Sequence, residues 1–177
     1  VAQVMEVQIG TDGVALAESN AGPRLKLTRR DIYRALAATV AGRPNRALMW
    51  RDVNPALPAT PIQIYGPPST SGTRDAFAEL ILDKGCVAEA ATKALKASDP
   101  DRFKQVCTSI REDGAYVESG ENDNLIVQKL AANPDAVGGV PDPIHAPGGG
   151  GTPSPMRAAA VFASAAKQSR AAGRLRT

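Results

Sequence analysis

Aromatic residues and histidine are scarce in this sequence. Phe, Trp and Tyr make up 4% of its 177 residues, so a hydrophobic core has to be built mainly from Ala, Leu, Val and Ile. The single histidine, His145, lies in a Gly- and Pro-rich stretch near the C-terminus. Its isolation argues against a metal site and leaves no histidine to activate a serine nucleophile in the rest of the chain. We therefore expect no metal, no cofactor and no catalytic residue.

Long apolar runs and several functional motifs are missing as well. No segment approaches the about 20 apolar residues of a membrane-spanning helix, and the first residues lack the basic-then-apolar layout of a secretory signal. Neither a Gly-x4-Gly-Lys phosphate loop nor a Gly-x-Ser-x-Gly elbow occurs, which argues against P-loop ATPases and α/β-hydrolases. Basic residues interleaved with aromatics, which line nucleic-acid grooves, are absent too, so no nucleic-acid partner is expected.

Positive charge is concentrated towards the end of the chain. The net charge is +3, but residues 1–136 carry 16 basic and 17 acidic side chains, whereas residues 137–177 carry 5 basic and 1 acidic side chain. The basic character of the whole sequence therefore indicates little about the ligand of residues 1–136.

The most informative stretch is Tyr65–Leu82. A β-leaning run ends at Gly66–Pro68, small hydroxyl residues and a glycine follow, and apolar residues then recur at helical spacing. We expect Thr70 or Ser71 to cap this helix and Gly85 to end it in a left-handed conformation. The apolar residues expected on its buried face are Ala76, Phe77, Leu80 and Ile81.

The first turn of this predicted helix, Ser71–Gly72–Thr73–Arg74, has the chemistry of an oxyanion site. The first amides of a helix have no acceptor within the helix and carry partial positive charge. Gly72 lets an anion approach the backbone, and Ser71 and Thr73 can add hydroxyl donors. Arg74 offers a planar fork that matches two oxygens of a tetrahedral anion. The alternative is an ordinary capped helix with a solvated arginine, because Ser-Gly-Thr before a helix is common.

The run Ile62–Phe77 resembles the phosphate-binding signature of the periplasmic substrate-binding proteins of phosphate ABC transporters, the PstS type. Three further blocks occur in the order found in that family: Trp50–Pro58, Ile110–Gly114 and Gly120–Asn124. The resemblance covers approximately residues 1–137 and is specific, because it rests on several separated blocks.

This resemblance implies an α/β fold of the periplasmic-binding-protein-like (type II) kind, in which two lobes close on one inorganic phosphate. In the family the Ser-Gly-Thr-Arg turn of the second lobe holds the anion, which implies that role for Ser71, Gly72, Thr73 and Arg74. The resemblance also implies a periplasmic monomer that presents phosphate to the membrane permease of an ABC transporter and has no catalytic activity.

Residues 1–60 are then expected to be part of the first lobe and residues 61–136 the second lobe. The family's preceding portion, with the signal peptide and the first lobe's own phosphate-binding loops, has no counterpart here, which suggests a fragment or a gene start placed too late. The resemblance ends after Ala136. Residues 137–177 are expected to form a disordered Gly/Pro/Ala/Arg-rich tail, with one helix at 156–172, or to result from a shift of reading frame.

Two cysteines, Cys86 and Cys107, bracket a predicted insertion of two short helices. Only one pairing is available to them, and an oxidising periplasm favours a disulfide that staples the insertion. Two buried free thiols are the alternative.

A second helix is expected to begin at Thr28. With Asp31 at the third helical position, this start reads as a variant of the capping box. The residues expected on its buried face are Ile32, Ala35 and Leu36, and those expected on a solvated face, rather than at an anion site, are Arg29, Arg30 and Arg34.

Phosphate binding is thus the expected function, with three alternatives. These are binding of another tetrahedral oxyanion such as sulfate, a truncated or frameshifted product that binds nothing, and a secreted phosphate-responsive enzyme or sensor that shares the lobe. Phosphate keeps a proton near neutral pH, so a site that selects it against sulfate needs a carboxylate acceptor. We expect that acceptor in the first lobe of the family, because Asp75 more simply stabilises the start of its helix.

Overall fold

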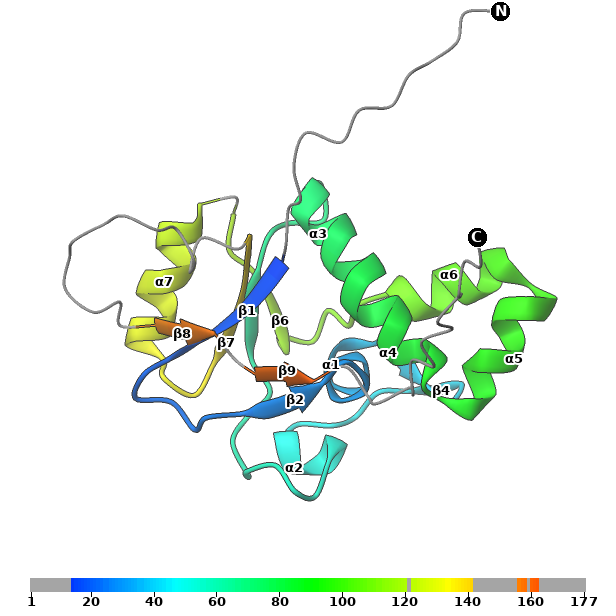
Figure 1. Ribbon diagram of the computed structural model, residues 1–177, viewed down its shortest axis with the longest axis horizontal. Coiled ribbons are helices and arrows are strands. Elements are labelled where there is room, and N and C mark those ends of the chain that lie inside the picture. Colours follow the sequence, from blue (N-terminus) through cyan, green and yellow to red (C-terminus); the bar gives the residue numbers. More distant parts are fainter. Residues whose placement is uncertain (1–13, 121, 142–155, 159, 163–177) are drawn as a thin grey trace, which may run out of the picture.

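The structure of this protein, a computed structural model, describes residues 14–120, 122–141, 156–158 and 160–162 (Figure 1). The strands of its main sheet are β1 (Val14–Ser19), β5 (Ile64–Gly66), β6 (Tyr116–Glu118), β7 (Val137–Pro141) and β8 (Met156–Ala158). They lie in the order β6–β5–β7–β1–β8. β5 runs parallel to β6 and β7, whereas β1 runs antiparallel to β7 and β8. The predicted α/β class is confirmed.

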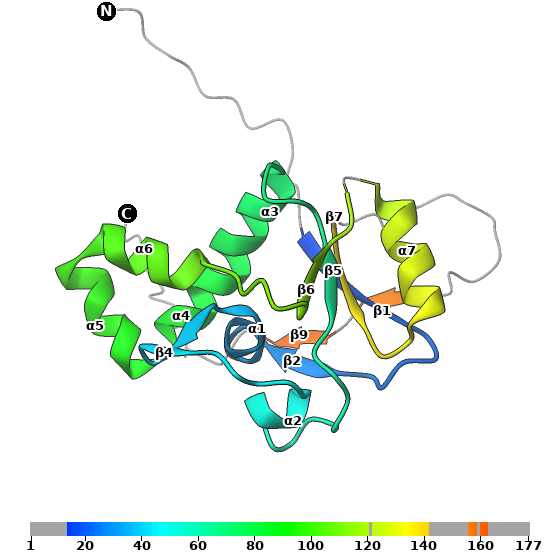
Figure 2. The same cartoon turned by 180° about the vertical axis from the view of Figure 1, so that it is seen from behind.

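Helices cover both faces of this sheet, as Figures 1 and 2 show from opposite sides. On one face, α7 (Asp123–Ala132) packs against β7, β5 and β1. On the other face, α3 (Gly72–Phe77) contacts β1 and β7. From α3 the chain continues without a break through a π-helical segment, η1 (Ala78–Asp83), into α4 (Lys84–Val87).

The remaining elements extend from this α/β centre. The helices are α1 (Arg29–Leu36), α2 (Trp50–Val53), α5 (Ala90–Ser98) and α6 (Pro100–Thr108). The α5–α6 hairpin lies at the end of the molecule opposite α7 (Figure 1). Short strands pair as β2 (Lys26–Thr28) with β9 (Ala160–Phe162) and as β3 (Thr39–Val40) with β4 (Arg43–Pro44). Within the described ranges, no helix is long and apolar enough to cross a membrane.

The predicted start of α1 is confirmed. The Asp31 amide donates to Thr28 Oγ1 at 3.1 Å, and the Thr28 amide donates to Asp31 Oδ2 at 2.9 Å, which together make the capping box. Ile32, Ala35 and Leu36 are fully buried, as their helical spacing predicts. Local sequence therefore determines both where α1 begins and which face it buries.

The helix that follows β5 begins as predicted but buries a different set of residues. Ser71 is the N-cap, which decides between the two expected caps. Phe77 and Ile81 are buried, but Leu82 is buried in place of Leu80, which is 45% exposed. The π-helical segment explains this change, because its bonds span five residues and shift the buried position one residue along the chain.

Gly85 does not end this helix, contrary to the prediction. It lies inside α4, where a Cβ would collide with the carbonyl oxygen of Arg29 and the side chain of Tyr33. The glycine therefore permits close packing of α4 on α1 rather than a left-handed stop.

Cys86 and Cys107 form a disulfide that joins α4 to α6 across a sequence separation of 21 residues. Both cysteines are fully buried and pack with Tyr33 and Phe103 in a small hydrophobic cluster. Between them, Asp99 caps α6 by accepting a hydrogen bond from the Arg102 amide at 3.0 Å. The bridge thus fixes the α5–α6 hairpin to the body of the protein.

The domain boundaries expected at residues 60 and 136 require correction. β1, assigned above to a first lobe, pairs with β7 in the same sheet as β5 and β6. One hydrophobic cluster contains Leu16, Trp50, Phe77 and Val137, which come from all parts of residues 14–141. Strands from both sides of residue 60 therefore share the main sheet, and one hydrophobic cluster spans them, so residue 60 does not separate two lobes among the described residues.

The disordered tail expected from residue 137 does not begin there, because residues 137–141 form β7, which lies between β5 and β1. Two glycines make this strand hard to recognise, but a Cβ on Gly138 would overlap Ile126 and Leu130 of α7. Within the helix expected at 156–172, residues 156–158 and 160–162 form strands instead. The other residues of that predicted helix lie outside the described residues. The same is true of residues 1–13 and of residues 142–155.

Candidate functional site

The Ser71–Arg74 turn lies at the carboxyl edge of the parallel part of the sheet. β5 runs parallel to β6, with Tyr65 beside Val117 and Gly66 beside Glu118, so the loops that leave both strands meet at this edge. The loop after β5 then leads into the first turn of α3. Ligands of open α/β sheets bind beyond the carboxyl ends of the strands, which is where this turn lies.

Backbone bonding leaves two amides of the turn open. Ser71 Oγ accepts a hydrogen bond from the Thr73 amide at 3.2 Å, and the Ser71 carbonyl accepts one from the Asp75 amide at 3.2 Å. No acceptor for the amides of Gly72 and Arg74 lies within hydrogen-bond range in the described part of the chain. The start of the helix therefore presents two N–H groups to an incoming anion.

Space is available next to these amides. Gly72 is exposed, and a Cβ built on it would meet no atom within 4 Å. Ser71 is only 4% exposed, and its buried side chain accepts the hydrogen bond from the Thr73 amide. An anion can consequently approach the backbone at Gly72 without displacing a side chain of the described residues.

Arg74 is held beside the turn. Its Nη1 donates to the Pro67 carbonyl at 3.3 Å, and its guanidinium carbon lies 4.1 Å from the centroid of the Tyr116 ring. Glu118 Oε1 lies 3.9 Å from Nη1, and the Arg74 side chain is 16% exposed. This placement disfavours the alternative of a solvated arginine, because the charge is fixed next to the open amides.

The ring of Tyr116 packs against the guanidinium group of Arg74. Its hydroxyl donates to the Pro67 carbonyl at 2.8 Å, so both side chains bond the same oxygen of the loop. Burial raises the pKa of Tyr116, although the Arg74 charge opposes this shift. A Cβ on Gly66 would collide with the Tyr116 hydroxyl, so the glycine at the end of β5 makes room for this contact.

Glu118, the last residue of β6, is the third side chain beside the turn, after Arg74 and Tyr116. Its Oε1 accepts a hydrogen bond from the Ser69 amide at 2.9 Å, and its side chain is 50% exposed. Its Oε2 makes no hydrogen bond to any residue that the structure describes. The cluster thus combines a fixed cation, two open amides and a fixed carboxylate.

Sequence reasoning predicted the turn but missed Tyr116 and Glu118. Both are more than 40 positions away in the chain and reach the turn through the pairing of β6 with β5. A usable signal is present in the sequence, because Tyr116 and Val117 are typical strand residues before Gly120, and parallel strands of an α/β sheet end at a common edge. Among the described residues, no group of three or more His, Cys, Asp and Glu side chains could hold a metal ion.

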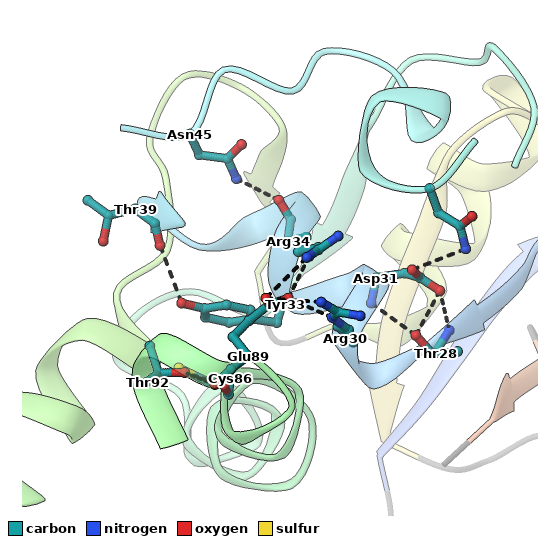
Figure 3. A network of polar contacts seen from close by, with 11 residues as sticks. Thr28, Arg30, Asp31, Tyr33, Arg34, Thr39, Asn45, Cys86, Glu89 and Thr92 are labelled. Carbon is teal, nitrogen blue, oxygen red and sulfur yellow. Dashed lines mark hydrogen bonds and ion pairs between the residues drawn. The ribbon is translucent and has the colours of Figure 1, made fainter. Parts of the chain in front are cut away.

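Two of the three arginines of α1, Arg30 and Arg34, stay partly exposed, as predicted, but both also bond Glu89, which the prediction did not include. Figure 3 shows Glu89 between Arg30 and Arg34. Its Oε1 accepts from Arg30 Nε at 2.7 Å and from Arg34 Nε at 2.5 Å. The hydrogen bond from Arg30 is the main cause that lowers the pKa of Glu89 to about 2. These two charges are therefore used to dock the start of α5 on α1.

Comparisons with known proteins identify the family. A family model described as "PBP superfamily domain" matches residues 1–168. The phosphate-binding protein PstS of Staphylococcus saprophyticus is 33% identical over 104 residues, which cover 56% of this chain and 28% of the relative. The crystal structure of a possible phosphate binding protein from Planctomyces limnophilus superposes with a TM-score of 0.52 at 19% identity, over 86% of this chain and 42% of that one.

The structural match shows that the fold is shared with that protein, and the chain spans less than half of the length of either relative. The family model, by contrast, covers nearly the whole chain, including the β5–α3 turn and the end of β6. The chain belongs to the PBP superfamily.

Proposed function

We propose that this chain binds inorganic phosphate at the Ser71–Arg74 turn. The observation that carries the proposal is the pair of open amides at Gly72 and Arg74 beside a fixed guanidinium. The similarity to a phosphate-binding protein of the PstS type supports phosphate as the anion.

The turn offers phosphate several kinds of donor at once. The two backbone amides can each bond one oxygen, and the positive end of α3 and its continuation favours the negative charge. Arg74 has five N–H donors, of which the Pro67 bond uses one, so others can bond a second oxygen. Thr73 is half-buried next to them and can add its hydroxyl.

The wider role that fits this site is that of the substrate-binding component of an ABC-type phosphate importer. Such a protein captures phosphate outside the cytoplasmic membrane and presents it to a membrane permease. The Cys86–Cys107 disulfide supports a periplasmic location, because disulfides persist in oxidising compartments. We further propose that the chain acts as a monomer and binds without catalysis, since the cluster offers donors and one carboxylate but no activated nucleophile.

Residues 14–141 form a single α/β unit, so phosphate would contact only one side of a two-sided cleft in this unit. We propose that this unit corresponds to the second lobe of the two-lobed proteins. The complementary lobe would supply the remaining contacts, and affinity for the isolated unit would be correspondingly lower than for a closed cleft.

Isothermal titration calorimetry with inorganic phosphate tests the proposal on the full 177-residue chain. The expected result is saturable heat that fits one site per chain. A parallel titration with sulfate tests the alternative oxyanion, and stronger binding of sulfate than of phosphate would replace phosphate as the proposed ligand. Absence of saturable heat with both anions would reject oxyanion binding and favour a product that binds nothing.

A further inference from the structure

Tyr116 reaches the anion turn from a distant part of the chain, yet it has no donor of its own to offer an anion. A tyrosine hydroxyl has one proton to donate, and that of Tyr116 is used in the 2.8 Å hydrogen bond to the Pro67 carbonyl. The residue is buried, with 9% of its surface exposed. Any contribution of Tyr116 to phosphate binding therefore has to pass through a neighbouring group.

That neighbouring group is the guanidinium of Arg74. Its carbon lies over the Tyr116 ring, 4.1 Å from the ring centroid, and Nη1 donates to the Pro67 carbonyl at 3.3 Å. The N–H donors of a guanidinium lie in its plane, so a ring that covers the face of the group leaves them for oxygen acceptors. The contact can therefore hold the cation without using the donors that an anion needs.

The fold in turn holds Tyr116 firmly. The pairing of β6 with β5 places it beside Ile64, and it belongs to the hydrophobic cluster that also contains Ile64 and Phe77. Gly66 lacks the Cβ that would collide with the tyrosine hydroxyl. Because the sheet fixes the ring, the ring provides a rigid support for Arg74.

We propose that Tyr116 is a positioning residue of the anion site, whose ring holds the Arg74 guanidinium beside the open amides of the turn. This inference rests on the proposed function of the Ser71–Arg74 turn. An arginine that is free to rotate loses side-chain entropy when it binds an anion, and a ring that orders it beforehand removes part of that cost. Phosphate affinity thus depends on a side chain that does not touch the anion.

The test is a double-mutant cycle of phosphate affinities, measured by calorimetry on the full 177-residue chain. Tyr116→Leu should weaken phosphate binding by about three- to tenfold, the effect of having to order one rotamer-rich side chain during binding. In the Arg74→Ala background, the same substitution should cause no further loss, because the ring acts only through Arg74.

Two further variants separate the ring from the fold. Tyr116→Phe keeps an aromatic face and should recover most of the affinity that Tyr116→Leu loses. Tyr65→Leu is the matched control, because Tyr65 is also 9% exposed and has the Lys129 ammonium 5.2 Å from its ring centroid. Tyr65 packs in a different hydrophobic cluster, with Ile126 of α7, so its replacement should leave phosphate affinity unchanged.

NMR of the ¹⁵N-labelled chain gives a second readout that needs no Leu variant. A group above an aromatic ring is shifted by the ring current, so the Nε–Hε signal of Arg74 should differ from that of Arg51, which is exposed on α2. The Arg74→Ala variant assigns the signal by its loss. An Arg74 signal at the position of the exposed arginine would overturn the inference.

The inference and the proposed function fail in different ways. A loss in Tyr116→Leu that persists in the Arg74→Ala background would show that the ring acts on the fold rather than on the cation, and would overturn the inference. Equal affinities of the unmodified chain and Tyr116→Leu would overturn it as well. If the unmodified chain shows no saturable heat with phosphate, both proposals are rejected. Thermal unfolding of each variant ensures that the comparison is made between folded proteins.

Discussion

At the scale of single residues, Arg74 gains its importance from how it is fixed. A free arginine side chain loses rotamer entropy when it binds an anion, which reduces the net gain. Arg74 has already lost part of that entropy, because its guanidinium stacks on Tyr116 and bonds the Pro67 carbonyl. The cation is thus preorganised beside the amides that it assists.

Replacing Arg74 by Ala should weaken phosphate binding by about 1.5–3 kcal/mol, the range for charge-assisted hydrogen bonds. Calorimetric titration of the variant measures this loss. Arg51→Ala is the control, because Arg51 is exposed on α2 and outside the cluster. Equal affinities for Arg74→Ala and Arg51→Ala would remove Arg74 from the site.

Gly72 gives a second prediction in which stability and affinity change in opposite directions. Gly72 lies in a helix with open space at its Cβ position, so Gly72→Ala should raise the free energy of unfolding by about 0.4–1 kcal/mol through the unfolded chain. The same methyl group would occupy the approach to the open amides and weaken phosphate binding. Denaturant unfolding of this variant checks the expected rise in stability, and phosphate titration checks the expected loss of affinity. Tighter phosphate binding would argue against a ligand at this position.

The residue scale also shows what could be derived from sequence. Ser71 and Arg74 were predictable, because capping and the position of a side chain within one turn are local properties. Tyr116 and Glu118 were not, because their approach to the turn depends on the register of β6 with β5. Register is set by long-range pairing, which a short stretch of sequence does not encode.

At the scale of elements, the ion pairs of Glu89 with Arg30 and Arg34, called here the Glu89 clasp, explain how the α5–α6 hairpin is attached to α1. Two guanidinium groups bond one carboxylate of which 11% is exposed, and the Cys86–Cys107 disulfide lies in the adjoining cluster. Figure 3 shows Glu89 bonded to both arginines, with Tyr33 and Cys86 in the same view. The disulfide and these ion pairs therefore both hold the hairpin to the body of the protein.

This clasp predicts a specific dependence of stability on pH. The pKa of Glu89 falls from an ordinary value of 4.5 to about 2 in the folded protein. A lowered pKa means that its contribution to stability is complete above pH 4.5 and is lost as the pH falls towards 2. Glu89→Gln should lower the free energy of unfolding at neutral pH by about 1–2 kcal/mol, because both arginines are partly exposed.

Denaturant unfolding at a series of pH values measures this effect. The difference in stability between the unmodified chain and Glu89→Gln should be constant above pH 4.5 and shrink below it. A difference that stays constant down to pH 2 would show that the carboxylate is not the group responsible.

Elements were predicted well where the signal is local and poorly where packing decides. The capping box at Thr28 and the cap at Ser71 follow from side chains that bond their own helix. The π-helical segment and the place of Gly85 follow from how that helix packs on α1, which no local periodicity reveals. Leu80 is consequently exposed where a regular α-helix would have buried it.

At the scale of the whole molecule, β7 connects the two parts of the sheet. It pairs in parallel with β5 and antiparallel with β1, and Val137 at its start is fully buried. The strand is therefore a central element although its sequence contains two glycines. Without β7, the facing edges of β5 and β1 would each expose a row of unpaired backbone groups.

Truncation after residue 136 should abolish cooperative unfolding, since it removes the strand between β5 and β1. The control is truncation after residue 162, which keeps β7, β8 and β9. Circular dichroism during thermal unfolding distinguishes the two chains. A normal transition for the shorter chain would mean that residues after 136 add nothing to the core.

The location of the oxyanion is the point on which the functional account depends. An amide NMR titration of the ¹⁵N-labelled full chain with inorganic phosphate tests it most directly, because each backbone N–H reports separately. The account predicts saturable shifts that are largest for the amides of Gly72, Thr73 and Arg74 and that need a higher phosphate concentration to saturate in Arg74→Ala. Shifts confined to other parts of the chain, such as the arginines of α1, or no shifts at all would contradict it.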